Sequence, residues 1–134
     1  MFCWLFPTLL FMTSWSSVDP QPIVGRWQGE CSGGYHDNLT YGATEYEFTK
    51  DFKVKTSMRF YMDPNCTKDG FDDGTKSEGK YALSKRLSWN QKFRLHIRWS
   101  EKNEIFSKEA RFPEADVLEL CSNQSCERFQ RKSP

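Results

Sequence analysis

The chain has 134 residues, of which 37% are hydrophobic, 16% aromatic and 28% charged, and its formal net charge is +1. This length suits one domain with a substantial core. The near-neutral charge provides no long-range field of the kind that draws nucleic acid to a protein. Aromatic rings pack well on pleated surfaces, so the composition favours β-sheet over helix. We expect one β-rich domain and no nucleic-acid partner.

The amino-terminal stretch 1–12 is apolar and carries no charged side chain. It is too short to cross a bilayer but suits the hydrophobic region of a signal peptide. Ser14-Trp15-Ser16 supplies the small-x-small pattern that precedes cleavage, so we predict a signal peptide over 1–16 and one domain over 17–134. The basic region that usually opens a signal peptide is missing, and retention of the segment as an anchor is the alternative. Cleavage would give a secreted or periplasmic protein that is not integral to a membrane.

Removing that segment also removes Cys3 and leaves four cysteines, an even number that indicates two disulfides in an exported chain. Their spacing lacks the paired C-x-x-C knuckles of a zinc site, and we expect neither a metal nor a cofactor. Of the three possible pairings we favour Cys31–Cys66 with Cys121–Cys126. The second pair flanks a tight polar loop that could bring two antiparallel strands face to face.

The first predicted strand is Ile23–Cys31. Pro20 and Pro22 oppose a helix and fix an extended approach, and the two residues that open the strand are β-branched. Gly25 permits a bend or a close backbone contact. Trp27 is large enough to close one end of a small barrel, with its indole N–H free to meet a carbonyl. An ordinary core tryptophan on an edge strand is the alternative.

The remaining strands are predicted from alternation of apolar and polar residues. The longest pattern is 52–62, in which one face is apolar, including Phe60 and Met62, and the other is mainly basic. The polar segments 32–44 and 67–78 are expected to form loops. The other predicted strands are 45–49, 79–83, 93–99, 105–112, 117–121 and 126–131.

Eight short strands without a convincing helix predict an all-β fold. An eight-stranded antiparallel up-and-down barrel accounts for them best, because closure removes the exposed edges that an open sheet would leave. A β-sandwich is the alternative.

Gly25-x-Trp27 in the first strand, eight antiparallel strands and a basic residue near the end of the last strand resemble the lipocalin (calycin) superfamily. The run Phe60–Thr67 is similar to secreted bacterial lipocalin-like proteins. The resemblance implies that an arginine of the last strand packs over Trp27. Arg128 or Arg131 would fill this role, and we assign it to Arg128 as part of a structural motif with Gly25 and Trp27.

The two histidines do not form a catalytic constellation. His96 lies between Arg94 and Arg98 on the polar face of its strand, and His36 lies beside Asp37 in a glycine-rich loop. Neither is accompanied by a serine or cysteine nucleophile in a recognisable turn. We therefore expect no enzymatic activity, and a hydrolase that uses His36 is a distant third hypothesis.

The apolar faces of an eight-stranded barrel either fill its interior or line a pocket. In the first hypothesis the protein carries a small apolar or amphipathic ligand at the open barrel end. Four residues are expected to contact that ligand: Phe60, Met62, Tyr81 and Trp99. In the second, the barrel is filled and serves as an envelope or extracellular interaction module, whose loops 32–44 and 67–78 contact a protein or a surface.

Overall fold

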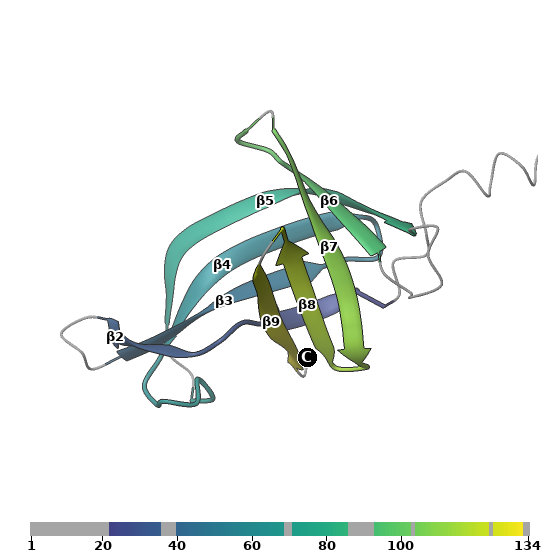
Figure 1. Ribbon diagram of the computed structural model, residues 1–134. Coiled ribbons are helices and arrows are strands. Elements are labelled where there is room, and N and C mark those ends of the chain that lie inside the picture. Colours follow the sequence, from purple (N-terminus) through teal and green to yellow (C-terminus); the bar gives the residue numbers. More distant parts are fainter. Residues whose placement is uncertain are drawn as a thin grey trace, which may run out of the picture.

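The structure, a computed structural model, describes residues 22–35, 40–68, 71–85, 93–102, 104–123 and 125–132 (Figure 1). The predicted signal peptide and His36 lie outside these ranges. Within them the chain forms β-strands and no helix, and hence no helix that could cross a bilayer. The strands are β1 (Gly25–Gln28), β2 (Ser32–Tyr35), β3 (Thr40–Phe48), β4 (Lys53–Tyr61), β5 (Phe71–Lys85), β6 (Phe93–Trp99), β7 (Ile105–Glu114), β8 (Val117–Ser122) and β9 (Ser125–Lys132).

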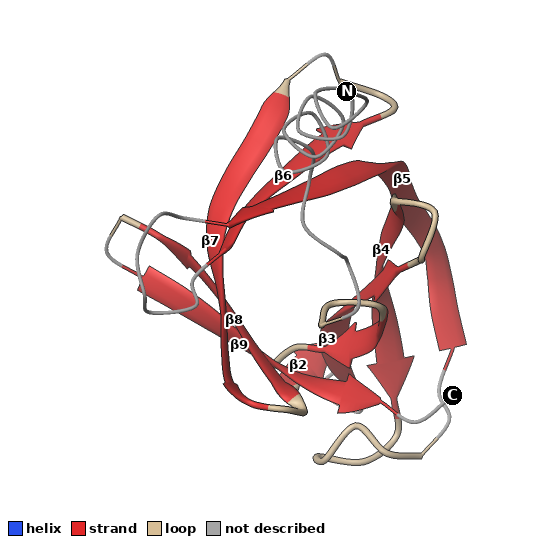
Figure 2. Cartoon of the chain, turned by 90° about the vertical axis from the view of Figure 1, so that its right-hand side faces the viewer, coloured by secondary structure: helices blue, strands red, loops and turns tan. Residues whose placement is uncertain are grey.

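These strands form one closed antiparallel barrel. From β2 to β9 each strand pairs with the next, and β1 closes the ring by pairing with both β9 and β3. Since β1 and β2 pair with successive parts of β3, they share one position, and the barrel has eight strands around its circumference (Figure 2). The predicted fold is confirmed. The β-sandwich is wrong because a single sheet closes on itself.

Two strands extend into segments that we predicted as loops. β2 lies inside 32–44, where β3 also begins, and Figure 1 shows this part of the sheet reaching beyond the ring. β5 begins at Phe71, inside 67–78, and runs for 15 residues. Glycine and charged residues indicated loops there, but main-chain pairing with β3 and β4 holds both segments in the sheet. A register shift opposite Ser57 and Arg59 places a bulge in β5.

The middle of the barrel is filled by side chains. The predicted alternation holds in β6, where Leu95 and Ile97 are buried, and at the start of β4, where Val54 is buried between exposed lysines. It fails at the end of β4, where the neighbours Phe60 and Tyr61 are both buried. Twelve buried residues form the core, and six partly buried rings pack against it. The buried set is Ile23, Trp27, Phe48, Val54, Tyr81, Leu83, Leu95, Ile97, Ala110, Leu118, Leu120 and Phe129, and the rings are Tyr46, Phe52, Phe93, Trp99, Phe106 and Phe112.

Trp27 closes one end of this core. Its side chain is fully buried, and its indole N–H donates a 2.8 Å hydrogen bond to the carbonyl of Ile23, as expected. The arginine over its ring is Arg131, with the guanidinium carbon 4.2 Å from the ring centroid. Our assignment of Arg128 is therefore wrong. Arg131 lies directly opposite Trp27 in the β1–β9 pairing and shares its face. Arg128, three residues away, points outward and pairs with Glu119 and Glu114.

Gly25 allows this close approach. Its φ of 132° lies in a region that other residues rarely adopt. A Cβ at this position would lie 2.7 Å from Nη1 of Arg131. The Gly25-x-Trp27 motif therefore leaves room for the arginine as well as placing the tryptophan.

The favoured cysteine pairing is confirmed. Cys31 is joined to Cys66, with Cα atoms 5.9 Å apart, and Cys121 to Cys126, with Cα atoms 4.0 Å apart. Cys66 is buried with Tyr61 and Ala43 in a small second cluster. The other bridge joins directly opposed residues of β8 and β9. Two such pairs are consistent with an oxidising extracellular or periplasmic environment.

Candidate functional site

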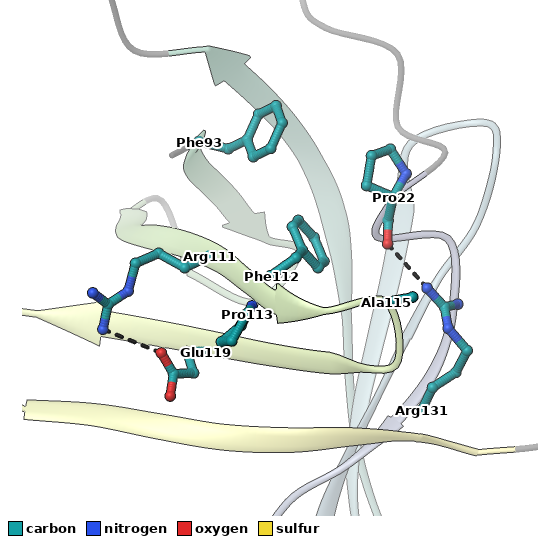
Figure 3. A pocket seen from close by; sticks show the side chains of 8 residues that line it. All are labelled: Pro22, Phe93, Arg111, Phe112, Pro113, Ala115, Glu119 and Arg131. Atoms are coloured by element: carbon teal, nitrogen blue, oxygen red, sulfur yellow. Dashed lines mark hydrogen bonds and ion pairs between the residues drawn. The ribbon is translucent and has the colours of Figure 1, made fainter. Parts of the chain in front are cut away.

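A pocket of about 700 Å³ lies at the barrel end that Trp27 closes (Figure 3). The start of β6, the end of β7, the β7–β8 turn, the end of β9 and the residues before β1 meet there, because neighbouring strands are antiparallel. Eight residues line the pocket: Pro22, Phe93, Arg111, Phe112, Pro113, Ala115, Glu119 and Arg131. The site is assembled from segments far apart in the sequence.

Two phenylalanines form its apolar wall. Phe93 opens β6 and Phe112 lies near the end of β7, and their ring centroids are 6.0 Å apart in an edge-to-face arrangement. Phe112 also lies 6.1 Å from the ring of Trp27. Both phenylalanines are only partly buried while packed against the core. The pocket therefore has the barrel core as its floor.

Arg131 forms the opposite wall together with Pro22, as Figure 3 shows. Its Nη1 donates to the carbonyl of Val24 at 2.7 Å, and its Nη2 donates to the carbonyl of Pro22 at 3.1 Å. Its Nε lies 3.2 Å from a carboxylate oxygen of Asp116 in the β7–β8 turn. The guanidinium thus holds the rim in place while its positive charge remains beside the pocket.

A second charged pair bounds the pocket on the β7–β8 side. Nη2 of Arg111 lies 3.2 Å from a carboxylate oxygen of Glu119, its cross-strand partner. A register shift after Arg111 inserts an extra residue into β7 before Glu114. Pro113 lies within this bulge, consistent with its lack of a ladder donor. The bulge brings the Pro113 ring into the pocket wall.

The pocket is suited to binding a ligand that is apolar on one side. The described residues of its lining supply aromatic and proline rings with charges only at the edge, and none of them is a histidine, serine or cysteine. Across the residues that the structure describes, no group of three His, Cys, Asp or Glu is placed to hold a metal ion.

The four predicted ligand contacts lie elsewhere and are not brought together. Phe60 is buried and stacks on Phe71, with centroids 5.2 Å apart, in the part of the sheet beyond the ring. Met62 follows the end of β4 and is 60% exposed. Trp99 ends β6, whose other end carries the pocket. Alternation identified inward faces correctly for Phe60 and Trp99, but it does not give the height of a residue along the barrel axis.

Tyr81, the fourth predicted contact, is a core residue. Its hydroxyl donates a 2.6 Å hydrogen bond to the carbonyl of Thr49, and its ring meets Phe48 edge-to-face at 5.0 Å. Burial, with a smaller contribution from the charge of Asp51, raises the pKa of Tyr81 to about 12. The phenol therefore remains neutral and acts as a buried donor.

A buried carboxylate on the outer face of the barrel lies outside the predicted site. Glu45 is 6% exposed and is held by Nη2 of Arg26 and Nζ of Lys132, each at 3.1 Å, and by the hydroxyl of Tyr61. Burial raises the pKa of Glu45, but the hydrogen bonds from Tyr61 and Lys132, the charge of Lys132 and the Arg26 bond outweigh it, so the pKa is lowered overall. This network ties β1, β3, β4 and β9 together.

His96 also lies on the outer face. Its Nδ1 is 2.8 Å from the hydroxyl oxygen of Ser107 on β7, and its Nε2 is 3.5 Å from that of Ser84 on β5. The ring lies on the polar face of its strand, as predicted, and is half-buried between the serines of the two neighbouring strands.

No protein-family model matches the chain, and no curated protein matches it. Among solved structures the chain is similar to one described as a de novo design of a fluorescence-activating β-barrel, with a TM-score of 0.42 and 15% identity over 86% of this chain and 99% of that one. A likeness this weak supports no argument about function.

Proposed function

We propose that the protein binds a small apolar or amphipathic ligand in the end pocket without transforming it. The observation that carries this proposal is the pocket itself. Its volume of about 700 Å³ falls inside the range of roughly 300–1,000 Å³ that is typical of small-molecule sites, and such sites are mainly apolar with a few placed polar groups. Phe93 and Phe112 supply the apolar surface, and Arg131 supplies the charge.

The binding energy would come chiefly from covering the exposed edges of Phe93 and Phe112. Burial of apolar surface contributes about 25 cal/mol per Å² before the costs of ordering the ligand are subtracted. The N–H groups of Arg131 already donate to carbonyls and pair with Asp116, so the guanidinium and this carboxylate together form a polar rim. A ligand with an apolar body and a polar or charged end fits this arrangement best.

Export of the protein is the second part of the proposal. It is supported by the two cysteine pairs at disulfide distance and by the signal-peptide pattern over 1–16. A carrier or scavenger that is secreted or periplasmic would encounter amphipathic molecules of this kind. Binding them requires no cofactor.

The binding site is tested by filling it. Ala115 lies in the exposed β7–β8 turn and lines the pocket, so Ala115→Trp adds bulk there without removing a core contact. The matched control is Ile105→Trp at the other end of β7, where the side chain is 58% exposed. Anilinonaphthalene sulfonate, an amphipathic anion with a fluorescence that rises in apolar surroundings, serves as the probe.

We expect saturable binding at one site, weakened by about tenfold or more in Ala115→Trp, which corresponds to about 1.4 kcal/mol, and unchanged in Ile105→Trp. Equal affinity in the two tryptophan variants would refute binding in the end pocket, provided that both proteins give the same circular dichroism spectrum.

An interaction module remains the second candidate, because two large apolar side chains are exposed on the sheet beyond the ring. Met62, which follows the last residue of β4, is 60% exposed, and Phe71, the first residue of β5, is 45% exposed. Substitution of both residues by serine would lower the affinity for a protein partner that docks there and leave the affinity for the probe unchanged. Unchanged partner binding would leave ligand binding in the end pocket as the better account, whereas loss of probe binding would place the probe beside Met62 and Phe71.

A further inference from the structure

The Cys121–Cys126 disulfide has an arginine directly against it. Nη2 of Arg111 lies 3.2 Å from Sγ of Cys121 and 3.2 Å from Sγ of Cys126. The three side chains share the outer face of the barrel, because Arg111 and Cys121 lie two pairs apart on neighbouring strands and Cys121 lies opposite Cys126. A positive charge beside a cysteine sulfur stabilises the thiolate form, which is the leaving group in disulfide exchange.

The same disulfide is accessible and is not required to hold its strands together. Cys126 is exposed, whereas Cys66 of the other bridge is 1% exposed. The residues joined by the hairpin bridge are already opposed in the β8–β9 ladder, which continues from Ser122 and Ser125 to Val117 and Gln130. Opening this bridge therefore leaves the main-chain pairing of the hairpin in place.

We propose that the Cys121–Cys126 pair is a thiol–disulfide exchange site that reacts with small anionic thiols such as glutathione. The inference is independent of ligand binding in the end pocket. The sulfur of Cys126 is attacked because it is the exposed one. The sulfur of Cys121 leaves as a thiolate, which the positive charge of Arg111 stabilises.

The reaction balances as two successive exchanges. A glutathione thiolate attacks Sγ of Cys126, the bond between the two protein sulfurs breaks, and Cys121 leaves as a thiolate. A second glutathione thiolate then attacks the glutathione sulfur of the mixed disulfide and releases the Cys126 thiolate with oxidised glutathione. Two thiols become one disulfide, and the protein pair gains two electrons together with the two protons that the thiols lost.

Other charges around the bridge partly oppose Arg111. Glu119 lies 3.2 Å from Nη2 of Arg111 and is also paired, at 3.6 Å, with Arg128. Glu109 lies opposite Cys121, and Arg94 lies opposite Glu109. The formal charges of Arg94, Arg128, Glu109 and Glu119 cancel, which leaves the charge of Arg111. The direct contact of Arg111 with both sulfurs therefore decides the sign of the effect.

A surface hollow of about 560 Å³ lies beside the bridge, and its lining is the reason for proposing an anionic thiol. Two cationic side chains and several hydroxyl and amide groups face it, with one carboxylate among them. Its lining is Arg94, Ser107, Glu109, Arg111, Cys121, Ser122, Asn123, Ser125 and Cys126. Serine and asparagine side chains can hydrogen-bond the carboxylates and peptide groups of glutathione.

The test follows each disulfide separately in the intact protein. The oxidised protein is incubated with glutathione at a series of reduced-to-oxidised ratios, quenched with acid, alkylated, and mapped by peptide mass spectrometry. We expect the Cys121–Cys126 pair to become reduced, and a glutathione adduct to appear on Cys126, at ratios that leave Cys31–Cys66 intact. Reduction of both pairs at the same ratio would overturn the proposal.

Variants of the charge beside the bridge provide the second readout. Arg111→Met should slow reduction by glutathione roughly tenfold, while Arg111→Lys should keep part of the rate. The effect of Arg111→Met should be smaller for cysteamine, a cationic thiol. An unchanged rate with glutathione in a folded Arg111→Met protein would contradict the role of the arginine.

Glu119→Gln keeps the test decisive if Arg111→Met does not fold. It retains the arginine and removes the carboxylate that competes for it, so reduction by glutathione should become faster by about twofold or more. A slower or equal rate in Glu119→Gln would also count against the proposal.

Discussion

The guanidinium of Arg131 lies over the ring of Trp27, with its central carbon 4.2 Å from the ring centroid, and also donates hydrogen bonds to the carbonyls of Val24 and Pro22. One side chain of the last strand thus fixes the first strand and the residues before it. Because Arg131 and Pro22 also line the end pocket, closure of the barrel and formation of the pocket depend on the same contact.

Arg131→Met should destabilise the barrel by about 2–3 kcal/mol. It removes a cation–π contact and charged hydrogen bonds to two carbonyls while keeping an apolar stem over Trp27. Arg128→Met is the matched control, since Arg128 is exposed and its ion pairs lie at the surface. Urea unfolding of the three proteins measures the free energies. Similar values for the two variants would show that Arg131 has no special role.

Glu45 should make stability depend on pH. Its pKa in the folded protein is below its usual value of 4.5, so the stability it contributes is fully present above the pKa of the unfolded chain and is lost as pH falls through the folded pKa. Glu45→Gln should cost about 1–3 kcal/mol at neutral pH, because Arg26 and Lys132 lose their carboxylate. The variant should differ less from the wild type in acid.

The control for this prediction is Glu47→Gln. Glu47 follows on the same face of β3 and is exposed, so its substitution should change the free energy of unfolding by less than about 0.5 kcal/mol at either pH. Urea unfolding across a pH series gives both curves. A Glu45→Gln curve that runs parallel to the wild type from neutral pH into acid would contradict the lowered pKa.

The two disulfides should contribute unequally to stability. The residues of the Cys31–Cys66 bridge are 35 apart in sequence and those of Cys121–Cys126 are 5 apart. The loop-entropy relation gives about 4 kcal/mol for the longer loop and about 2 kcal/mol for the shorter one. Replacing each pair by serines and measuring unfolding tests this order. A larger loss for the hairpin pair would contradict it.

Phe60 should matter for stability but not for binding. It is 6% exposed and stacks on Phe71, so Phe60→Ala should cost about 3 kcal/mol of stability. The affinity for anilinonaphthalene sulfonate should be unchanged, because Phe60 does not line the end pocket. Phe93→Ala should lower that affinity. Loss of probe binding in a folded Phe60→Ala protein would move the site to the far part of the sheet.

The sequence predicted the barrel because alternation and turn residues are local signals. Runs such as 52–62 and 93–99 carry a period of two, and the inward set that it gives is buried around Leu95 and Ile97. Trp27 and both cysteine pairs followed from residue type and count. The strand segments 32–35 and 71–78 were missed because their glycine and acidic residues resemble loops, whereas pairing with β3 and β4 determines their structure.

The end pocket was harder to predict because it depends on which strand ends meet. Phe93 begins one predicted strand and Phe112 ends another, but their proximity follows from the β6–β7 register. The choice between Arg128 and Arg131 required the pairing of β1 with β9. Met62 was placed on the inward face because the alternating sequence pattern continues to it. The strand itself ends at Tyr61, one residue earlier, so Met62 is exposed.

Native mass spectrometry of the protein purified from its natural compartment tests the central claim most directly. We predict an added mass of a few hundred daltons, on the order of a drug-sized ligand, that is lost on denaturation and is absent from Ala115→Trp produced in the same cells. The ligand should be present in Ile105→Trp. A bare polypeptide mass for the wild type, or the same added mass in Ala115→Trp, would contradict ligand binding in the end pocket.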